Sequence, residues 1–338
     1  KKFLSKENIG GVILFAKNYE GPAQLAELVN SIQQCRDEYP LFIGIDHEGG
    51  RVIRFKKNFT QFPAMEKIAK LNSPKLVYEV HRVMAQELGA CGINLSFSPV
   101  CDVLRPTTTK AIGDRAFSND PIEVEKYVSA AIRGLQTNQI MSCAKHFPGH
   151  GNTSKDSHFD LPYITQGMDE FKNIDFIPFS KASRSKVDFM MMAHLVCDAI
   201  DKDLPCSLSP KAYDLLRKEL KFKRCIISDD MNMEAITKNW GFEEAAAMAI
   251  EAGCNILCYR HFTDAQKGLE GIKEKYRSKS LDKTTLEERL SQITEMKKQN
   301  LKTYNPIYIP EITDKFKAAN GKELLEDIQK QFTTRKIT

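Results

Sequence analysis

Seven short apolar runs, separated by amphipathic stretches, are the feature of this sequence that most limits its fold. The runs are nearly continuous in apolar residues, and they fall at 10–15, 41–46, 93–100, 140–147, 187–195, 224–230 and 254–259. Strands that are covered on both faces have this composition, because neither face meets water. The pattern therefore predicts a parallel β-sheet.

Helices are expected between these strands. Apolar residues recur at helical spacing over 21–38, 73–92, 120–138, 209–220 and 241–253. Several of these segments begin with a Ser or Asp cap followed by Pro and end at Gly or Asn, which are typical helix boundaries. Strand–helix alternation over 338 residues leaves two α/β folds, a doubly wound sheet or an eight-stranded (β/α) barrel.

The barrel is the fold that we expect. No GxGxxG or GxxxxGK[ST] motif follows a strand, which argues against the usual nucleotide-binding folds. A (β/α)8 barrel of the TIM type needs one strand more than the seven apolar runs supply, so the first strand is expected to be missing or to precede residue 1. We expect a single barrel domain over 1–280. Residues 281–338 are expected to form a helical and extended appendage packed on it, beginning with an exposed amphipathic helix.

Composition narrows the class of protein. The net charge is +5 and the lysines are scattered, without a stripe of basic and aromatic residues. This argues against nucleic-acid binding and suits a small anionic substrate. No apolar run is long enough to span a membrane. A monomer is expected, although no feature fixes the oligomeric state.

Cysteine usage bears on the compartment. The nine cysteines form no CxxC pair, and several lie in apolar runs, which is typical of free thiols in a reducing compartment. No signal peptide is visible, so a cytoplasmic location is expected. A periplasmic or exported location stays open, because the chain does not begin with Met.

Polar residues follow several of the predicted strands. In a (β/α) barrel the catalytic groups lie at the carboxyl ends of the strands, and this rule selects Asp46, His47, Glu48, Arg51, Arg54, Asp102, Asp114, Arg115, His194, Asp229 and Asp230. Taken singly, several of them have structural interpretations: Asp46 or Arg54 as a strand-end ion pair, Asp102 as a loop cap and His194 as a structural histidine.

Asp229 and Asp230 are adjacent, so their side chains diverge. One is expected to face the barrel mouth and the other to cap the following turn.

The segment "KHFPGHGNTSKDSH" at 145–158 contains three of the seven histidines of the chain. "FPGHG" predicts a stiff turn. Asp156 lies two residues before His158, close enough for its carboxylate to orient the imidazole, which is what a general acid/base needs. The polar residues between are expected to form a mobile loop that closes over substrate. Zinc is an alternative, but HExxH, HxH and CxxC are all absent, and we expect no metal and no cofactor.

Five motifs together resemble glycoside hydrolase family 3. They are "IDHEGGRVIRF", "SPVCDV", "IGDRAF", "KHFPGHGNTSKDSH" and "ISDDMNMEAI", and the resemblance runs in order over about 10–260. "KHFPGHG" followed by "DSH" is the most specific part. Within the family, the motifs are most similar to the single-domain bacterial β-N-acetylglucosaminidases that recycle cell-wall fragments. The resemblance implies a (β/α) barrel with its site at the carboxyl ends of the strands.

The resemblance also implies roles for individual residues. Asp229 would be the nucleophile, and His158 the acid/base with Asp156 as its partner. Sugar contacts would come from Asp46, Arg54, Arg115, Lys145 and His146. His150 would brace the turn.

The implied activity is retaining, exo-acting removal of N-acetylglucosamine from peptidoglycan-derived fragments. Two alternatives remain open. A histidine base would tolerate phosphate in place of water, which would make the protein a β-N-acetylglucosaminide phosphorylase. The protein could instead be a non-catalytic sugar-binding barrel, although such a protein would have no chemical need for Asp156, His158 and Asp229 together. The single Trp, Trp240, offers no stacking platform for a long polysaccharide.

Overall fold

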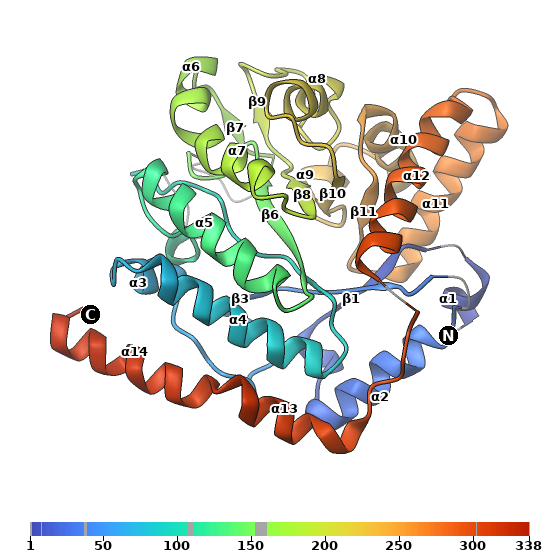
Figure 1. Cartoon of the computed structure of the whole chain (residues 1–338). Coiled ribbons are helices and arrows are strands. Elements are labelled where there is room, and N and C mark those ends of the chain that lie inside the picture. The colour runs from blue at the N-terminus through green and yellow to red at the C-terminus, as the bar shows by residue number, and fades with distance from the viewer. Residues whose placement is uncertain are drawn as a thin grey trace.

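The computed structural model describes residues 2–7, 9–36, 39–106, 111–152, 161–301 and 303–337. Its main sheet has seven parallel strands in chain order (Figure 1): β1 (Gly11–Leu14), β2 (Phe42–Ile45), β5 (Leu95–Ser96), β6 (Met141–Phe147), β8 (Phe189–Met192), β10 (Cys225–Asp230) and β11 (Ile256–Cys258). Each strand pairs with the next along the chain. One strand lies in each of the seven predicted runs, so the parallel sheet is confirmed.

The sheet is strongly curled. The rings of Phe42 on β2 and Phe189 on β8 meet edge to face with their centroids 5.3 Å apart, although β5 and β6 lie between these strands in the sheet. The two rings belong to a buried apolar cluster that also holds side chains from β5, β6, β10 and β11. The structure is therefore an α/β fold of the (β/α) barrel type with a filled interior.

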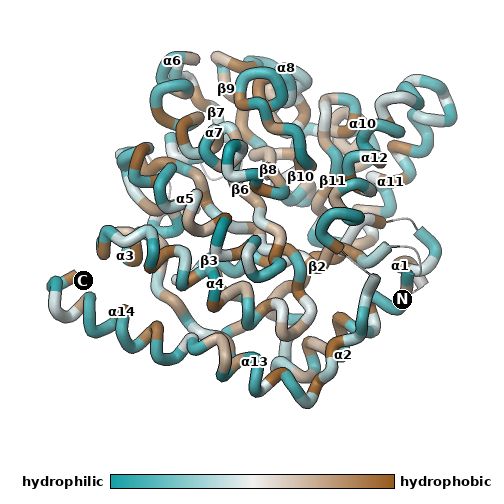
Figure 2. Tube along the Cα trace, viewed as in Figure 1, coloured by the Kyte–Doolittle hydropathy of each residue, from teal (hydrophilic) through white to brown (hydrophobic). Residues whose placement is uncertain are grey.

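Helices cover the outside of the sheet. The five predicted segments form α2 (Pro22–Gln33), α4 (Pro74–Ala90), α5 (Pro121–Gln136), α8 (Pro210–Asp214) and α10 (Phe242–Ala252). The predicted caps are present: the side chains of Ser73, Asp120 and Ser209 accept backbone N–H groups of the first turns of α4, α5 and α8. Two further buried clusters lie between these helices and the outer faces of the strands, one against α2 and the other against α4, α5, α8 and α10. They explain why the strand sequences are apolar on both faces. Figure 2 shows hydrophobic residues along the strands.

Shorter helices and two small sheets complete the barrel. The remaining helices of the barrel are α1 (Lys2–Lys6), α3 (Met65–Ala69), α6 (Met168–Glu170), α7 (Phe176–Arg184), α9 (Glu234–Thr237) and α11 (Phe262–Arg277). The antiparallel pair β3 (His47–Gly49) and β4 (Val52–Ile53) follows β2, and β7 (Tyr163–Ile164) pairs with β9 (Val196–Cys197). Both small sheets lie in the chain after strands of the main sheet, where a barrel builds its site.

The C-terminal segment packs on the barrel through α12 (Lys283–Asn300), α13 (Ile312–Ala319) and α14 (Gly321–Arg335). α13 and α14 run along the outer side of α4 (Figure 1). The backbone of Ile307 exchanges two hydrogen bonds with the Asn30 side chain of α2, 2.8 and 3.1 Å long. α12 was predicted to be an exposed helix, which is only partly right. Its Met296 is buried in the cluster that fills the sheet interior. The division of the chain at residue 280 stays a proposal.

Candidate active site

Charged side chains from β2 and β6 meet at the carboxyl end of the sheet. Lys145, near the end of β6, places its Nζ atom 2.8 Å from Oδ1 of Asp46, which directly follows β2. The other carboxylate oxygen of Asp46 accepts a hydrogen bond from Nη2 of Arg54 at 2.9 Å. Three of the predicted sugar-contact residues are therefore joined, with Asp46 held between two cations.

Glu48 extends this cluster toward the loop that follows β5. Its carboxylate accepts hydrogen bonds from Nε and Nη2 of Arg115, each 2.8 Å long, and Oε1 lies 2.6 Å from Nζ of Lys145. The side chain of Glu48 is only 3% exposed. Sequence reasoning placed Glu48 at this end of the sheet but gave it no role. Its spacing of two from Asp46 was the available signal, because residues i and i+2 of an extended segment share a face.

The ion pairs set the charge of this cluster. Burial acts to raise the pKa of Asp46, but Lys145 and Arg54 outweigh it and hold this pKa well below its usual range. Burial likewise acts to raise the pKa of Glu48, whereas Arg115 and Lys145 lower it to about 2. Both carboxylates are therefore ionised at neutral pH.

His146 is oriented by a buried aspartate. Its Nδ1 atom lies 2.8 Å from Oδ2 of Asp102, which follows β5 and is fully buried. Because an ionised carboxylate accepts, this contact places a proton on Nδ1. Nε2 lies 3.5 Å from Nη2 of Arg115, which is a donor. Arg115 and His146, the other two predicted sugar contacts, therefore adjoin.

Asp102 is the second residue that sequence reasoning left out of the site. It does cap a loop, as predicted, because its Oδ1 accepts the backbone N–H of His150 at 2.7 Å. Burial acts to raise the pKa of Asp102, but its interactions with His146 and His150 lower it. His150 itself is buried, and its role as a brace of the turn stays a prediction.

Asp229 and Asp230 end β10 and diverge as predicted. Asp230 caps the following turn: its carboxylate accepts the N–H of Asn232 at 3.0 Å and pairs with Arg260 at 2.8 Å. Oδ1 of Asp229 accepts the N–H of Asp230 at 2.8 Å. Burial acts to raise the pKa of Asp229, but His146 and His194, the N–H of Asp230 and Lys145 lower it. Because β10 runs parallel to β8, β6 and β2 in the sheet, its carboxyl end places Asp229 at the same end of the sheet as the cluster.

Other polar residues at the strand ends have structural roles. Nδ1 of His194 lies 2.7 Å from the Ser207 hydroxyl, and Nε2 lies 3.1 Å from the backbone carbonyl of Asp230. This agrees with its interpretation as a structural histidine.

His47 and Asp114 also lie outside the cluster. The His47 ring is buried against Phe59, with ring centroids 5.6 Å apart. Asp114 pairs with Arg51 at 2.9 Å, and nearly half of each side chain is exposed.

Two predicted catalytic residues, Asp156 and His158, lie outside the described residues, as does the loop that was expected to be mobile. The structure describes the chain up to Asn152 and again from Leu161. Within the described ranges, His, Cys, Asp and Glu form no group of three or more that could hold a metal ion.

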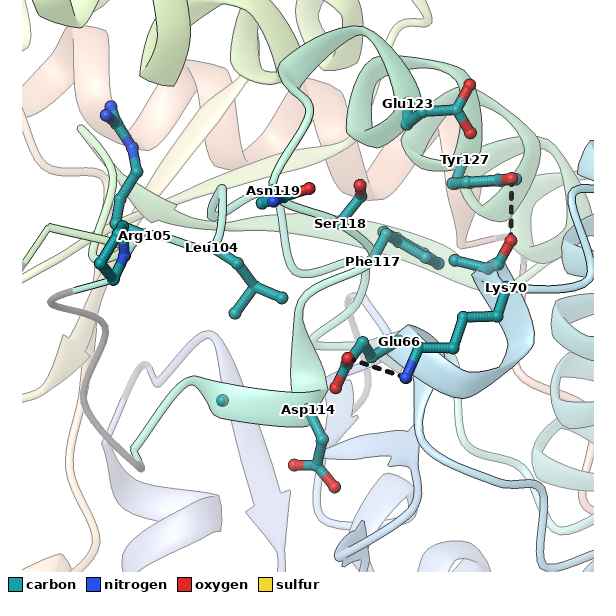
Figure 3. Close-up of a pocket in the computed structure, with 13 residues that line it drawn as sticks. Glu66, Lys70, Leu104, Arg105, Asp114, Phe117, Ser118, Asn119, Glu123 and Tyr127 are labelled. Carbon is teal, nitrogen blue, oxygen red and sulfur yellow. Dashed lines mark hydrogen bonds and ion pairs between the residues drawn. The ribbon is translucent and has the colours of Figure 1, made fainter. Parts of the chain in front are cut away.

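A pocket of 680 Å³ lies between α3, the loop that follows β5 and α5. Figure 3 shows Glu66 and Lys70 directed toward each other at its edge, where they form an ion pair of 3.2 Å. Arg105 and Asp114, from the loop that follows β5, also line it. Asp46, Lys145 and Asp229 are not among its described lining residues, so this pocket is separate from the cluster.

Comparison with known proteins identifies the family. The family described as "Glycosyl hydrolase family 3 N terminal domain" matches residues 1–296. The chain belongs to glycoside hydrolase family 3. The resemblance in the five motifs is thereby confirmed, and the protein is a glycoside hydrolase.

Curated members of family 3 are similar over most of this chain. It is 40% identical over 261 residues to the beta-hexosaminidase of Nitrosomonas eutropha, an alignment that covers 75% of this chain and 74% of that protein. It is 39% identical over 265 residues to the beta-hexosaminidase of Neisseria meningitidis serogroup C, which covers 76% and 73% of the two chains.

Solved structures of family 3 members share the fold. The β-N-acetylglucosaminidase of Paenibacillus sp. superposes with a TM-score of 0.89 at 29% identity, over 98% of this chain and 64% of that one. NagZ from Neisseria gonorrhoeae, in complex with N-trifluoroacetyl-D-glucosamine, gives a TM-score of 0.78 at 30% identity, over 98% and 93% of the two chains. A fungal multi-domain β-N-acetylglucosaminidase gives 0.92 at 28% identity, and the chain spans 40% of its length.

Proposed function

We propose that this family 3 protein is a retaining, exo-acting β-N-acetylglucosaminidase that removes terminal N-acetylglucosamine from peptidoglycan-derived fragments. Two findings support the choice of sugar. The curated relatives are named beta-hexosaminidase, and the Neisseria gonorrhoeae relative was solved with an N-acylated glucosamine.

The observation that carries the proposal is the position of Asp229 at the end of β10, at the same end of the parallel sheet as the cluster assigned to sugar binding. A carboxylate nucleophile must be ionised to attack an anomeric carbon. The lowered pKa of Asp229 supports this role: burial acts to raise it, but His146, His194 and Lys145 lower it.

The reaction would proceed by double displacement. A carboxylate oxygen of Asp229 forms a bond to the anomeric carbon while the glycosidic C–O bond breaks, and His158 gives its proton to the leaving oxygen. Water then attacks the anomeric carbon, His158 takes the proton of that water, and the bond to Asp229 breaks. Asp156 would hold the imidazole in the tautomer that both steps require.

The cluster around Asp46 would recognise the terminal sugar. Each carboxylate oxygen of Asp46 accepts one bond from a cation and keeps a lone pair for a sugar hydroxyl. The donors of Lys145 and Arg115 would reach hydroxyls or the acetamido oxygen. Because Glu48 holds both of these cations, the donors are fixed before substrate arrives.

A histidine acid suits an anionic leaving group. Neutral imidazole does not repel a carboxylate on the leaving sugar as a second carboxylate would. Peptidoglycan fragments carry a lactyl carboxylate on the muramic residue, and the net charge of +5 favours an anionic substrate.

A cytoplasmic location is part of the proposal. All nine cysteines are free, which is typical of proteins in a reducing compartment. In the described part of the chain no helix is long and apolar enough to cross a membrane.

The test compares an aryl N-acetyl-β-glucosaminide with the matching aryl β-glucoside, in phosphate-free buffer and again with phosphate added. Preference for the acetamido sugar without phosphate is the expected result. Preference for the plain glucoside would overturn the assignment of N-acetylglucosamine as the sugar that is removed. Dependence on phosphate with release of a sugar 1-phosphate would make the protein a phosphorylase. No turnover of either substrate would favour the sugar-binding barrel.

A further inference from the structure

A buried polar network lies outside the charged cluster and is centred on Asp175, in the helical segment between α6 and α7. The Asp175 residue is 1% exposed. Its Oδ2 atom accepts hydrogen bonds from Nη2 of Arg105 at 2.9 Å and from Nε2 of Gln166 at 2.7 Å. Arg105 belongs to the loop after β5 (Figure 3), so one carboxylate joins the segments that follow β5 and β6.

The same network reaches the turn that precedes residues 153–160. Oε1 of Gln166 accepts a hydrogen bond from Nδ2 of Asn152 at 2.7 Å. Asp175 also packs against Gly149: a Cβ atom added to this glycine would lie 2.9 Å from Oδ1 and from Cβ of Asp175. Gly149 has φ +131°, a backbone conformation that side chains disfavour. The 149–152 segment therefore interacts with Asp175 in two ways: Gly149 packs directly against it, and Asn152 is connected to it by hydrogen bonds through Gln166.

The same backbone also lies close to the loop that follows β5. A Cβ atom on Gly151 would lie 1.8 Å from the carbonyl oxygen of Val103. The 149–152 segment therefore contacts the β5 loop at Gly151 and Asp175 at Gly149, and a larger residue at either glycine would displace a neighbour.

Stability is a poor explanation for this network. Removing charges from water is costly, and a buried ion pair is often no more stable than an apolar replacement. Burial raises the pKa of Asp175 to about 6, even though Arg105 and Gln166 oppose it. Among the described residues, Oδ1 of Asp175 has no hydrogen-bond partner. Such a costly arrangement fits a geometric task better than a stabilising one.

We propose that Asp175 is a positioning residue of the active site, which fixes the backbone at 149–152 and so sets where the chain departs toward His158. The inference rests on the proposed function, because it requires His158 to be the acid/base. Asp175 touches no reacting atom, and it acts through Gln166, Asn152 and Gly149.

The test is the leaving-group dependence of Asp175→Asn. Misplacing the acid should slow substrates with poor leaving groups, such as an N-acetylglucosamine disaccharide, by about tenfold or more, because general acid catalysis contributes about 10²–10⁴-fold. An activated aryl glycoside, which needs little proton assistance, should lose less than about threefold. Asp188→Asn is the matched control: Asp188 is equally buried and pairs with Arg224 at the start of β8, so it should lower the melting temperature without a selective effect.

A second variant tests the same proposal if Asp175→Asn does not fold. Asn152→Ala removes the link to Gln166 from a residue that is partly exposed, and it should show the same selective loss. If Asp175→Asn folds and slows both substrates equally, or if Asn152→Ala behaves as wild type, the positioning role is wrong while the proposed function stands. If the wild-type protein turns over neither substrate, the proposed function fails first.

Discussion

Glu48 and Lys145 form a buried ion pair, with Nζ 2.6 Å from Oε1 and both side chains no more than 3% exposed. Because Glu48 also binds Arg115 through both carboxylate oxygens, one residue fixes two of the cations that would contact the sugar. Both carboxylate oxygens of Glu48 are already bound to these two cations. We therefore interpret it as the anchor of the sugar-binding cations.

The first prediction concerns Glu48→Gln, which keeps the shape of the side chain and removes its charge. The KM for an aryl N-acetyl-β-glucosaminide should rise by about tenfold or more, because a hydrogen bond to a charged group contributes about 1.5–3 kcal/mol. Steady-state kinetics measure this change. An unchanged KM would show that the two cations hold their positions without Glu48.

The same variant should differ from wild type in its pH dependence of stability. The pKa of Glu48 is lowered from 4.5 to about 2 in the folded protein. Its contribution to the free energy of unfolding is therefore complete at a pH well above 4.5 and is lost as the pH falls from 4.5 toward 2. Between pH 7 and pH 4 the stability gap between wild type and Glu48→Gln should narrow by about 1 kcal/mol. Urea unfolding at the two pH values measures the gap, and a constant or widening gap would contradict the assignment.

The second prediction concerns Asp102→Asn. An amide can still accept the backbone N–H of His150, but it no longer fixes the proton of His146 on Nδ1. Turnover should fall by at least about tenfold, because one charge-assisted hydrogen bond is lost. Asp214→Asn, at an exposed ion pair with Lys218, is the control and should leave kcat/KM unchanged. Wild-type kinetics for Asp102→Asn would mean that the orientation of His146 is irrelevant to turnover.

The third prediction concerns His47, which is buried with neither ring nitrogen hydrogen-bonded to a described residue. Burial lowers its pKa to about 4. Between its unfolded value of about 6.5 and this folded value, the unfolded chain binds a proton that the folded protein does not, so stability falls on acidification. Between pH 7 and pH 5 the free energy of unfolding should therefore fall by about 2 kcal/mol less in His47→Phe than in the wild type. Equal losses in variant and wild type, measured by urea unfolding, would refute the lowered pKa.

The fourth prediction concerns His158→Ala. A proton donor matters most when the leaving oxygen is a poor leaving group. The variant should therefore lose far more activity on a disaccharide than on an activated aryl glycoside, by a ratio of at least about 100. Comparing kcat/KM on the two substrates measures the ratio. Equal losses on both would assign the acid role to another residue.

The sequence was sufficient to predict the sheet but not all of its helices. Strands covered on both faces leave a continuous apolar signal, and all seven were found. α11 was not predicted, although Phe262, Ala265, Leu269, Ile272 and Tyr276 recur in it at helical spacing. Its interior glycines, Gly268 and Gly271, lower the helix propensity of the segment. α7 was not predicted either. It contains Pro178 and follows the irregular turn Phe171–Asp175, features that obscure helical periodicity.

The candidate site was predictable in its charged residues but not in its connections. Asp46, Arg54 and Lys145 were selected and do adjoin. Glu48 and Asp102 were given no role in the site, because only the folded structure shows that Glu48 binds Arg115, 67 residues away, and that Asp102 binds His146, 44 residues away. Asp46 and Lys145, which are 99 residues apart, were selected through the family motifs. Only the pairing of the strands brings such residues together, and no local pattern reports it.

The measurement that tests the central claim most directly is proton NMR of the sugar first released from an aryl N-acetyl-β-glucosaminide in phosphate-free buffer. Double displacement through Asp229 inverts the anomeric centre twice. β-N-acetylglucosamine should therefore appear first and then mutarotate to the equilibrium mixture. Initial release of the α-anomer would contradict double displacement, because a single displacement by water would leave no role for a glycosyl-enzyme intermediate.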